Sequence, residues 1–293
     1  MGLVKTAIKT LIHPLREPAS WALQQGILPA SSRSFFPWSW GVEPFTIHGD
    51  DFKARYYPSA VDTVGQRIFW TGFREWEKDT VPVFLQLLRE SRCFIDIGAN
   101  CSIYPVLACA VNPKIQVVAV EPVPKIFAAL ENNVRSNQLT GRVKLIQAAV
   151  STEEGIAHFH ESTDPTMGSL SPDGYRGKPG KVIEVKTTTL DKIVSQLPVP
   201  PDFIKIDVEG FEDVVLSGGD HTLSVHKPRF VVEANPDGPF LKLTEIFSRY
   251  GYSFYHLAED GLVKKPGIQP NMDPDYDCRN WLCVPPGGSP PKL

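Results

Sequence analysis

Short apolar runs alternate with longer mixed segments along most of this chain. Runs at 93–97, 115–120, 143–150, 203–208 and 230–233 have the length and composition of strands buried on both faces of a sheet. Segments between them, such as 103–111 and 124–137, carry apolar residues at helical spacing. This alternation of strand and helix predicts an α/β fold with a doubly wound, mostly parallel sheet.

Other patterns complete the outline. Apolar and polar residues alternate over 45–57, which predicts a strand pair. The pattern over 61–88 predicts mainly helix. Segments 155–161 and 181–188 have strand character and bracket a polar loop, 162–180, for which we expect a role as a lid or acceptor-binding loop, with disorder as the alternative. A helix at 241–250 and strands at 251–257 and 281–284 are expected to close the sheet.

The two ends of the chain differ from this central part. Residues 3–12 predict an amphipathic helix with Lys5 and Lys9 away from its apolar face, and 29–44 is an aromatic-rich, irregular segment. We expect the helix to pack on the protein or on a second copy, with a weak membrane-surface anchor as the alternative. The predicted organisation is an N-terminal extension at 1–44, one domain at 45–285 and a disordered tail at 286–293.

Composition narrows the class of protein. The 293 residues are 42% hydrophobic, which is enough for a full hydrophobic core. The net charge of −3 does not indicate the basic surface that binds nucleic acid. The five cysteines lack C-x-x-C spacing, so we expect reduced thiols. With neither a signal peptide nor a run of about 20 apolar residues, the sequence predicts a cytoplasmic protein without stable membrane insertion.

Two acidic residues stand at the ends of neighbouring predicted strands. Asp96 ends the first strand two residues before Gly98, and Glu121 ends the next. A dinucleotide site would show G-x-G-x-x-G, but the turn after Asp96 has one glycine and a carboxylate that repels phosphate. An acid placed like Glu121 accepts ribose hydroxyls, so the pair indicates S-adenosylmethionine. Ser102 is expected to cap the following helix.

Four motifs then carry a resemblance. They are Asp96-Ile-Gly-Ala-Asn100, Val120-Glu-Pro122, Thr189-Leu-Asp191, and Lys205-Ile-Asp-Val-Glu-Gly-Phe-Glu212 followed by Val215-Leu-Ser-Gly218. Together they resemble the FkbM family of S-adenosylmethionine-dependent methyltransferases over roughly residues 45–285. The resemblance implies a class I methyltransferase fold, which is Rossmann-like with a seven-stranded sheet. The family's second turn glycine is replaced here by Ser102.

The same resemblance implies a cofactor site around the first turn. Glu77 is expected to bind the ammonium of the cofactor's methionine part, with an exposed helix-start acid as the alternative, and Ala148 to lie beside adenine. The expected cofactor-binding residues are Glu77, Asp96, Gly98, Ala99, Asn100, Ser102, Glu121, Pro122 and Ala148.

Candidate catalytic residues lie on the fourth predicted strand. Lys205, Asp207 and Glu209 are two residues apart and share a face. They indicate acceptor binding and proton removal, with a structural ion pair as the alternative. We expect Asp207 to be the base or acceptor anchor, and Glu209 to orient it or to pair with Lys205.

A metal offers a second route to activating a hydroxyl. Asp207, Glu233 and Asn235 provide the oxygen atoms that Mg²⁺ prefers, although we favour a metal-free reaction. His158 and His160 face one way on a predicted strand, and with no third ligand apparent we expect a solvated face.

The sequence therefore predicts an S-adenosylmethionine-dependent O-methyltransferase. Its acceptor is expected to be a hydroxyl on a sugar, glycan or natural-product small molecule. Two alternatives stay open: an NAD-dependent oxidoreductase or epimerase, and a cofactor-binding partner subunit without turnover.

Overall fold

The computed structural model describes residues 15–24, 27–28, 42–162, 168–170, 179–235, 238–259, 261–269 and 279–292. The predicted helix at 3–12, the aromatic-rich segment up to residue 41 and most of the loop at 162–180 lie outside the described residues. Among those described, no helix combines the length and apolarity needed to cross a bilayer.

The centre of the molecule is an eight-stranded sheet with the order β12-β11-β13-β10-β9-β3-β4-β5. Five adjacent strands are parallel, and β13 runs antiparallel between β10 and β11. The mostly parallel sheet is confirmed, and β12 adds an eighth strand that the sequence did not predict. The strands are β3 (Cys93–Ile97), β4 (Gln116–Val120), β5 (Val143–Ile146), β9 (Phe203–Ile206), β10 (Arg229–Glu233), β11 (Ser253–Ala258), β12 (Gly261–Lys265) and β13 (Asn280–Val284).

Two smaller sheets flank it. The predicted strand pair is the hairpin β1 (Phe45–His48) and β2 (Lys53–Tyr56), and β6 (Ala149–Val150), β8 (Pro179–Thr188) and β7 (Gly155–Ser162) form a three-stranded sheet. The prediction of one strand over 143–150 is therefore wrong. The chain leaves the main sheet after Ile146, and β6 pairs with β8 instead.

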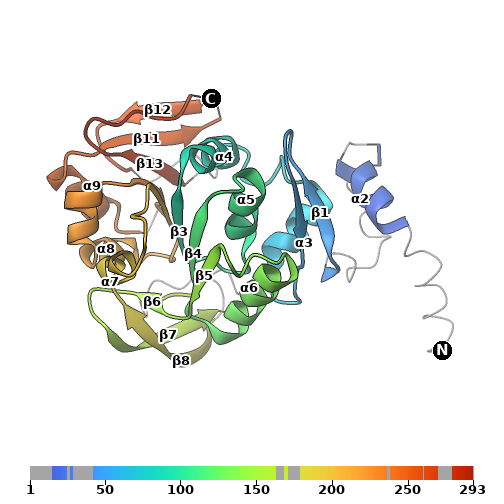
Figure 1. Ribbon diagram of the computed structural model, residues 1–293, viewed down its shortest axis with the longest axis horizontal. Coiled ribbons are helices and arrows are strands. Elements are labelled where there is room, and N and C mark those ends of the chain that lie inside the picture. Colours follow the sequence, from blue (N-terminus) through green and yellow to red (C-terminus); the bar gives the residue numbers. More distant parts are fainter. Residues whose placement is uncertain are drawn as a thin grey trace.

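Helices cover both faces of the central sheet, as a doubly wound fold requires (Figure 1). In that view α4, α5 and α6 lie to the right of β3 and β4, and α7, α8 and α9 lie to the left. A helix at 16–24 was not predicted. The helices are α2 (Arg16–Gln24), α3 (Thr63–Thr71), α4 (Thr80–Glu90), α5 (Ile103–Val111), α6 (Pro124–Ser136), α7 (Leu190–Ser195), α8 (Glu212–Ser217), the π-helix η4 (Thr222–His226) and α9 (Phe240–Arg249).

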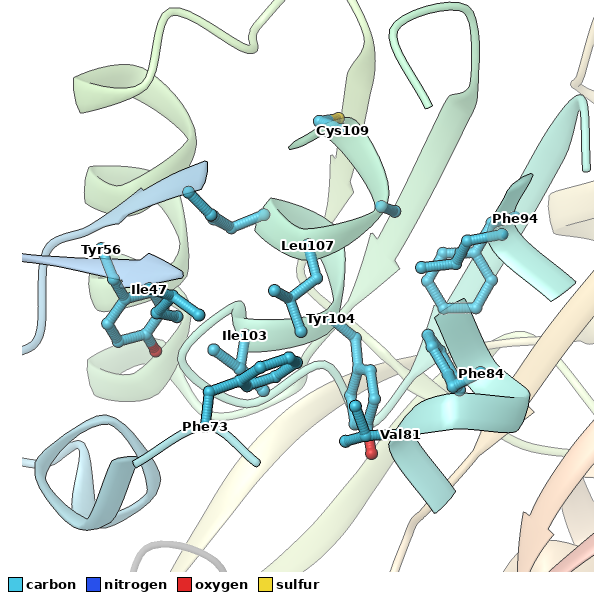
Figure 2. Packing of buried hydrophobic residues seen from close by; sticks show 14 of the residues in the cluster. Ile47, Tyr56, Phe73, Val81, Phe84, Phe94, Ile103, Tyr104, Leu107 and Cys109 are labelled. Atoms are coloured by element: carbon cyan, nitrogen blue, oxygen red, sulfur yellow. The ribbon is translucent and has the colours of Figure 1, made fainter. Parts of the chain in front are cut away.

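Alternate residues of the central strands point to opposite faces of the sheet and pack in two separate apolar clusters. Phe94, Phe203 and Val231 pack in the cluster that contains α4 and α5, and Ile95 and Ile204 pack in the one that contains α7, α8 and α9. Figure 2 shows the first cluster, with Phe84 of α4 beside Phe94 and with Tyr104 extending from α5 toward Val81. Because side chains alternate along a strand, Asp96, Lys205 and Glu233 fall on the α4/α5 face.

The predicted disorder of the C-terminal tail at 286–293 stays a prediction. Residues 285–292 form no helix or strand, yet Pro291 is buried and the N–H of Gly288 donates to the carbonyl of Pro285 at 3.0 Å. Prolines restrict the unfolded chain, so ordering this segment costs less entropy than its composition suggested.

Candidate functional site: a cleft at the carboxyl ends of the parallel strands

The turn after β3 folds tightly against the end of β9. Gly98 has φ +81°, and a Cβ there would lie 1.8 Å from the carbonyl oxygen of Asp207. The N–H groups of Gly98 and Ala99 both donate to the carbonyl of Val120, at 3.0 Å each. Only glycine fits this position, and its missing side chain keeps the strand ends close together.

The turn continues through two residues with left-handed backbone. Asn100 has φ +47°, and its Oδ1 accepts a hydrogen bond from the N–H of Cys101 at 2.7 Å. Ser102 immediately precedes α5 as predicted, but its side chain caps no backbone N–H and its φ is +91°. The prediction of a serine cap is therefore wrong, because this conformation suits the glycine that the resemblance places there.

A buried polar network holds the far side of this turn. The hydroxyl of Tyr56 lies 2.7 Å from Asp62 Oδ2 and 3.1 Å from the carbonyl oxygen of Cys101. Asn133 Nδ2 donates to the same carbonyl at 3.1 Å and to the carbonyl of Tyr57 at 2.8 Å. Burial raises the pKa of Asp62 to about 6. The hairpin β1/β2 and helix α6 thereby fix the turn from outside.

Glu121 is held by backbone amides on either side. Its Oε1 accepts from the N–H of Val123 at 2.9 Å, and its Oε2 accepts from the N–H of Asn100 at 3.2 Å. Burial raises the pKa of this carboxyl to about 7. A carboxylate offers about four lone-pair sites, so the predicted acceptance of ribose hydroxyls is compatible with these two bonds.

These strand ends border a cleft of about 580 Å³, counted to its open mouth. Seven predicted site residues line it, namely Gly98, Asn100, Glu121, Pro122, Ala148, Asp207 and Glu209. Five do not, namely Glu77, Asp96, Ala99, Ser102 and Lys205. Sequence reasoning missed most of its apolar wall, which includes Val123, Ile126, Phe159, Leu170, Val208 and Phe211. Of these, Phe211 belongs to a quoted motif, and Phe159 alternates with two histidines on β7.

We call Gly98, Asn100 and Glu121 the turn end of the cleft, and Asp207 and Glu209 with the neighbouring Glu233 the carboxylate end. At the carboxylate end, Lys205 Nζ lies 2.8 Å from Asp207 Oδ2 and is itself buried. The ammonium also lies 4.8 Å from the ring centroid of Tyr104.

The protonation of this pair follows from the charges around it. Burial acts to lower the pKa of Lys205, but the carboxylates of Asp207, Asp96 and Glu77 raise it overall. Burial acts to raise the pKa of Asp207, yet the charge of Lys205 holds it below its ordinary value. The ion pair that was the structural alternative to a catalytic role is thus present between Lys205 and Asp207. Asp207 nevertheless lines the cleft.

Glu209 does not pair with Lys205. Its Oε2 accepts from Asn235 Nδ2 at 3.1 Å, and Asn235 Oδ1 accepts from Arg279 Nη1 at 3.0 Å. One carboxylate oxygen from each of Asp207, Glu209 and Glu233 lies within 4.8 Å of the other two. This cluster adds Glu209 to Asp207 and Glu233, and Asn235 lies beside it through its hydrogen bond to Glu209.

The side chain of Asp96 has no hydrogen-bond partner among the described residues, although it is fully buried. Burial, with the negative charges of Asp207 and Glu77, raises its pKa to about 7 although Lys205 opposes the change. An unsatisfied buried carboxylate is costly, and because Asp96 does not line the cleft, it can act on a bound ligand through its charge.

Glu77 approaches the same region from the segment before α4. It accepts a hydrogen bond from the hydroxyl of Tyr104, and burial raises its pKa. It is therefore no exposed helix-start acid. Glu77, Asp96 and Asp207 all act electrostatically on Lys205, so three carboxylates share one ammonium.

Some motif residues have structural roles. Asp191 accepts hydrogen bonds from the N–H groups of His221 and Thr222, at 2.9 and 2.8 Å. Glu212 accepts from the N–H of Gly210 at 3.0 Å and orders the turn beside Glu209. His158 is exposed on β7, consistent with the predicted solvated face.

Comparison with known proteins identifies the family. The profile described as "Methyltransferase FkbM domain" matches residues 96–254, which is more than half of the chain. The chain belongs to the FkbM methyltransferase family. This membership argues against the alternative of an NAD-dependent oxidoreductase.

Two curated relatives match in part. The chain is 30% identical over 145 residues to hexuronic acid methyltransferase AglP of Haloferax volcanii, covering 48% of this chain and 56% of that protein. It is 31% identical over 138 residues to 31-O-demethyl-FK506 methyltransferase FkbM of Streptomyces tacrolimicus, covering 45% and 52%. The chain thus spans about half the length of each relative.

Solved structures show more distant likeness. A methyltransferase FkbM from Methylobacillus flagellatus KT aligns with 16% identity and a TM-score of 0.38, covering 78% of this chain and 49% of that one. A precorrin-6y C5,15-methyltransferase from Geobacter metallireducens aligns with 16% identity and a TM-score of 0.39, covering 69% and 84%.

Proposed function

We propose that this methyltransferase uses S-adenosylmethionine to methylate a hydroxyl on a sugar, glycan or natural-product small molecule. The observation that carries the proposal is the position of Asp207. Its carboxylate lines the same cleft as Gly98 and Glu121, while Lys205 holds it ionised. One cleft thus contains both the turn that is expected to bind the cofactor and a carboxylate that can accept a proton.

The charges of the site suit a cationic donor. The carboxylates of Glu77, Asp96 and Asp207 all act electrostatically on the ammonium of Lys205, and the carboxylate of Asp96 has no hydrogen-bond partner among the residues that the structure describes. S-adenosylmethionine supplies an electrophilic methyl on a positively charged sulfur, together with an ammonium group. Asp96 and Glu77 would attract the positive charges, and Glu121 would accept the ribose hydroxyls.

The acceptor side suits a hydroxyl group. Asp207 and Glu209 offer carboxylate oxygens, which accept hydrogen bonds from hydroxyls and hold an acceptor in a near-attack geometry. In the transfer the acceptor oxygen would gain the methyl as the S–CH₃ bond breaks with its electron pair left on sulfur, which gives S-adenosylhomocysteine, and Asp207 would take the proton of the acceptor's O–H. The relatives' names, one citing a hexuronic acid and the other an O-demethyl position, support a hydroxyl on an oxygen-rich small molecule.

The proposal extends to the setting of the reaction. We infer a cytoplasmic enzyme that takes a small-molecule or glycan acceptor and binds no nucleic acid, which the net charge of −3 supports. A homo-oligomer formed through the N-terminal helix stays a prediction, since residues 3–12 lie outside the described part.

The test uses purified full-length protein and methyl-labelled S-adenosylmethionine with extracts of its source cell and a panel of sugars and sugar acids. We expect label in products that resist mild alkali, because an ether withstands conditions that hydrolyse a methyl ester. Asp207→Asn protein serves as the matched control. Calorimetric titration with S-adenosylhomocysteine tests cofactor binding separately, and absence of both binding and label would refute the proposal.

A further inference from the structure

A groove opens beside the carboxylate end of the cleft, between the starts of α8 and α9. Its volume is about 900 Å³, counted to its open mouth. The two helices pack against each other, and Figure 1 shows them together on one side of the central sheet. Phe211 lines both this groove and the cleft, so the two hollows border each other.

Both walls of the groove begin at one hydrogen bond of the carboxylate end, in which Glu209 Oε2 accepts from Asn235 Nδ2 at 3.1 Å. The first wall starts one residue after Glu209, with Gly210 and Phe211. The second wall starts at Gly238, whose N–H donates to the carbonyl of Asn235 at 2.8 Å. A molecule whose hydroxyl reaches Glu209 from this side therefore lies in the groove.

The lining of the groove is apolar. Among its described lining residues, only Asp213 and Lys242 have polar side chains, and these two pair with each other at 3.3 Å. An apolar ligand leaves this ion pair intact, whereas a charged or hydroxyl-rich group would lose water without gaining a side-chain partner. The apolar side chains are those of Phe211, Val214, Pro239, Phe240 and Leu241.

Much of this apolar lining is open to solvent. Leu241, in the first turn of α9, is 74% exposed, and Phe211, Val214 and Phe240 are partly exposed. Apolar side chains that gather in an exposed groove are typical of a ligand site. Ile156 on β7 is exposed to a similar extent, at 71%, but it is not part of this groove, so it provides a control position.

We infer that the groove binds the apolar body of the methyl acceptor, while the reacting hydroxyl lies at Asp207 and Glu209. The acceptor is then a small molecule whose hydroxyl is carried on an aliphatic or aromatic skeleton, and not a free sugar or sugar acid. This inference rests on the proposed methyl transfer and narrows its class of acceptor. Phe211 contacts the acceptor next to its reacting end.

The first experiment measures binding without turnover. Full-length protein saturated with S-adenosylhomocysteine is titrated with myo-inositol, cyclohexanol and trans-4-phenylcyclohexanol, and affinities are read by ligand-observed NMR. The three probes share a six-membered ring with a hydroxyl and differ in apolar area. We expect trans-4-phenylcyclohexanol to bind at least about tenfold more tightly than cyclohexanol, which corresponds to burying roughly two methylene groups. Equal affinities, or tightest binding of myo-inositol, overturn the inference.

Two matched substitutions locate the binding. Leu241→Gln should weaken binding of trans-4-phenylcyclohexanol by about threefold to tenfold, because part of a leucine's burial is lost. Ile156→Gln should leave it unchanged. Titration with S-adenosylhomocysteine checks that both variants fold. Unchanged affinity for the phenyl probe in Leu241→Gln places the binding elsewhere and overturns the inference. A dimer that sedimentation shows dissociating in Leu241→Gln alone would make the groove an interface between copies, with the same consequence.

The labelling assay tests the acceptor class separately. With methyl-labelled S-adenosylmethionine and source-cell extract, we expect the labelled product to partition into butanol from water. The rate loss in Leu241→Gln should shrink as more extract is added, because the substitution weakens binding and leaves Asp207 in place. Label confined to water-soluble sugars would overturn this inference and support the proposed function. Absence of all label would count against the proposed function, while the probe affinities still decide the role of the groove.

Discussion

At the turn end of the cleft, backbone groups make most of the contacts, whereas at the carboxylate end side chains from several strands make them. Gly98 and Ala99 bond the backbone of β4, and Glu121 is held by two backbone N–H groups. Asp207 is paired instead with the ammonium of Lys205, and Glu209 accepts a hydrogen bond from the side chain of Asn235.

This difference separates two kinds of sensitivity. A backbone-built turn depends on which conformations each residue adopts, so a change of shape disrupts it most. A side-chain network depends on charge and protons, so even an isosteric change alters its chemistry. Each prediction below changes one of these properties and leaves the other as intact as the chain allows.

The largest effect is expected for Asp207→Asn. The amide keeps the shape of the side chain and loses the proton acceptor, so turnover should fall by roughly 10² to 10⁴-fold. Affinity for S-adenosylhomocysteine should stay within a few-fold, because the turn end is unchanged. Labelling rates and calorimetry check the two statements, and near-normal turnover would make the role of Asp207 structural.

The turn end is tested by Gly98→Ala. Its Cβ would meet the carbonyl oxygen of Asp207 at 1.8 Å, and φ is +81°, so the strand ends must separate. We expect S-adenosylhomocysteine affinity to fall more than tenfold and stability to fall by about 1–3 kcal/mol. Gly287→Ala is the control, because Gly287 has φ +79° with nothing within 4 Å of a Cβ. Equal behaviour of the two variants would show that the close approach is unimportant.

Asp96 and Glu121 provide a matched pair of buried acids. Each alanine variant should bind S-adenosylhomocysteine at least tenfold more weakly, since a charge-assisted contact contributes about 1.5–3 kcal/mol. Only Glu121→Ala should also lower the thermal midpoint, because it leaves the N–H groups of Val123 and Asn100 unpaired. Unchanged affinity in both variants would remove the cofactor assignment.

The pH dependence of the same two acids has a defined sign. Burial raises both pKa values to about 7, above the unfolded values near 4, so their contribution to stability is present at low pH and lost as pH rises through 7. A cationic ligand favours the charged forms, so affinity for S-adenosylmethionine should increase up to about pH 7 and then level off. Calorimetry across pH checks this, and Asp96→Ala should flatten the slope.

The smallest effect is expected for Ser102→Gly. A non-glycine residue in the left-handed region costs about 1–2 kcal/mol, partly offset by the greater freedom of glycine in the unfolded chain. We expect a gain of up to about 1 kcal/mol, seen as a thermal midpoint a few degrees higher. Gln138→Gly, at φ +58° in the loop after α6, is the control for strain away from the cleft. A lower midpoint for Ser102→Gly alone would mean that the hydroxyl contributes more than the backbone costs.

The turn end was predictable because its residues are contiguous in sequence. The spacing of Asp96, Gly98 and Asn100, with Glu121 at the end of the next strand, predicts how these residues lie relative to one another. The carboxylate end assembles from the residues just after β9 and the last residue of β10, so the acids were predictable but their pairings were not. Glu209 was expected to bond Lys205 and instead bonds Asn235.

The fold shows the same division. Apolar runs predicted the parallel strands because all of them except the edge strand β5 are largely buried between helices. The break after Ile146 was missed, because β6 is apolar like β5 and only its pairing with β8 separates them. The eighth strand was missed because Gly261–Lys265 is a mostly exposed edge with a weak apolar signal.

The network of Tyr56, Asp62 and Asn133 has a consequence for how this protein can be divided. Two of its three members lie before residue 96, where the match to the family begins. A fragment cut to residues 96–254 would carry all four signature motifs, yet the carbonyl of Cys101 would lose its Tyr56 partner and β10 would lose β13 beside it. The segment that matches the family profile is therefore shorter than the segment whose hydrogen bonds hold the fold together. Fragment boundaries should be placed so that these hydrogen bonds are kept.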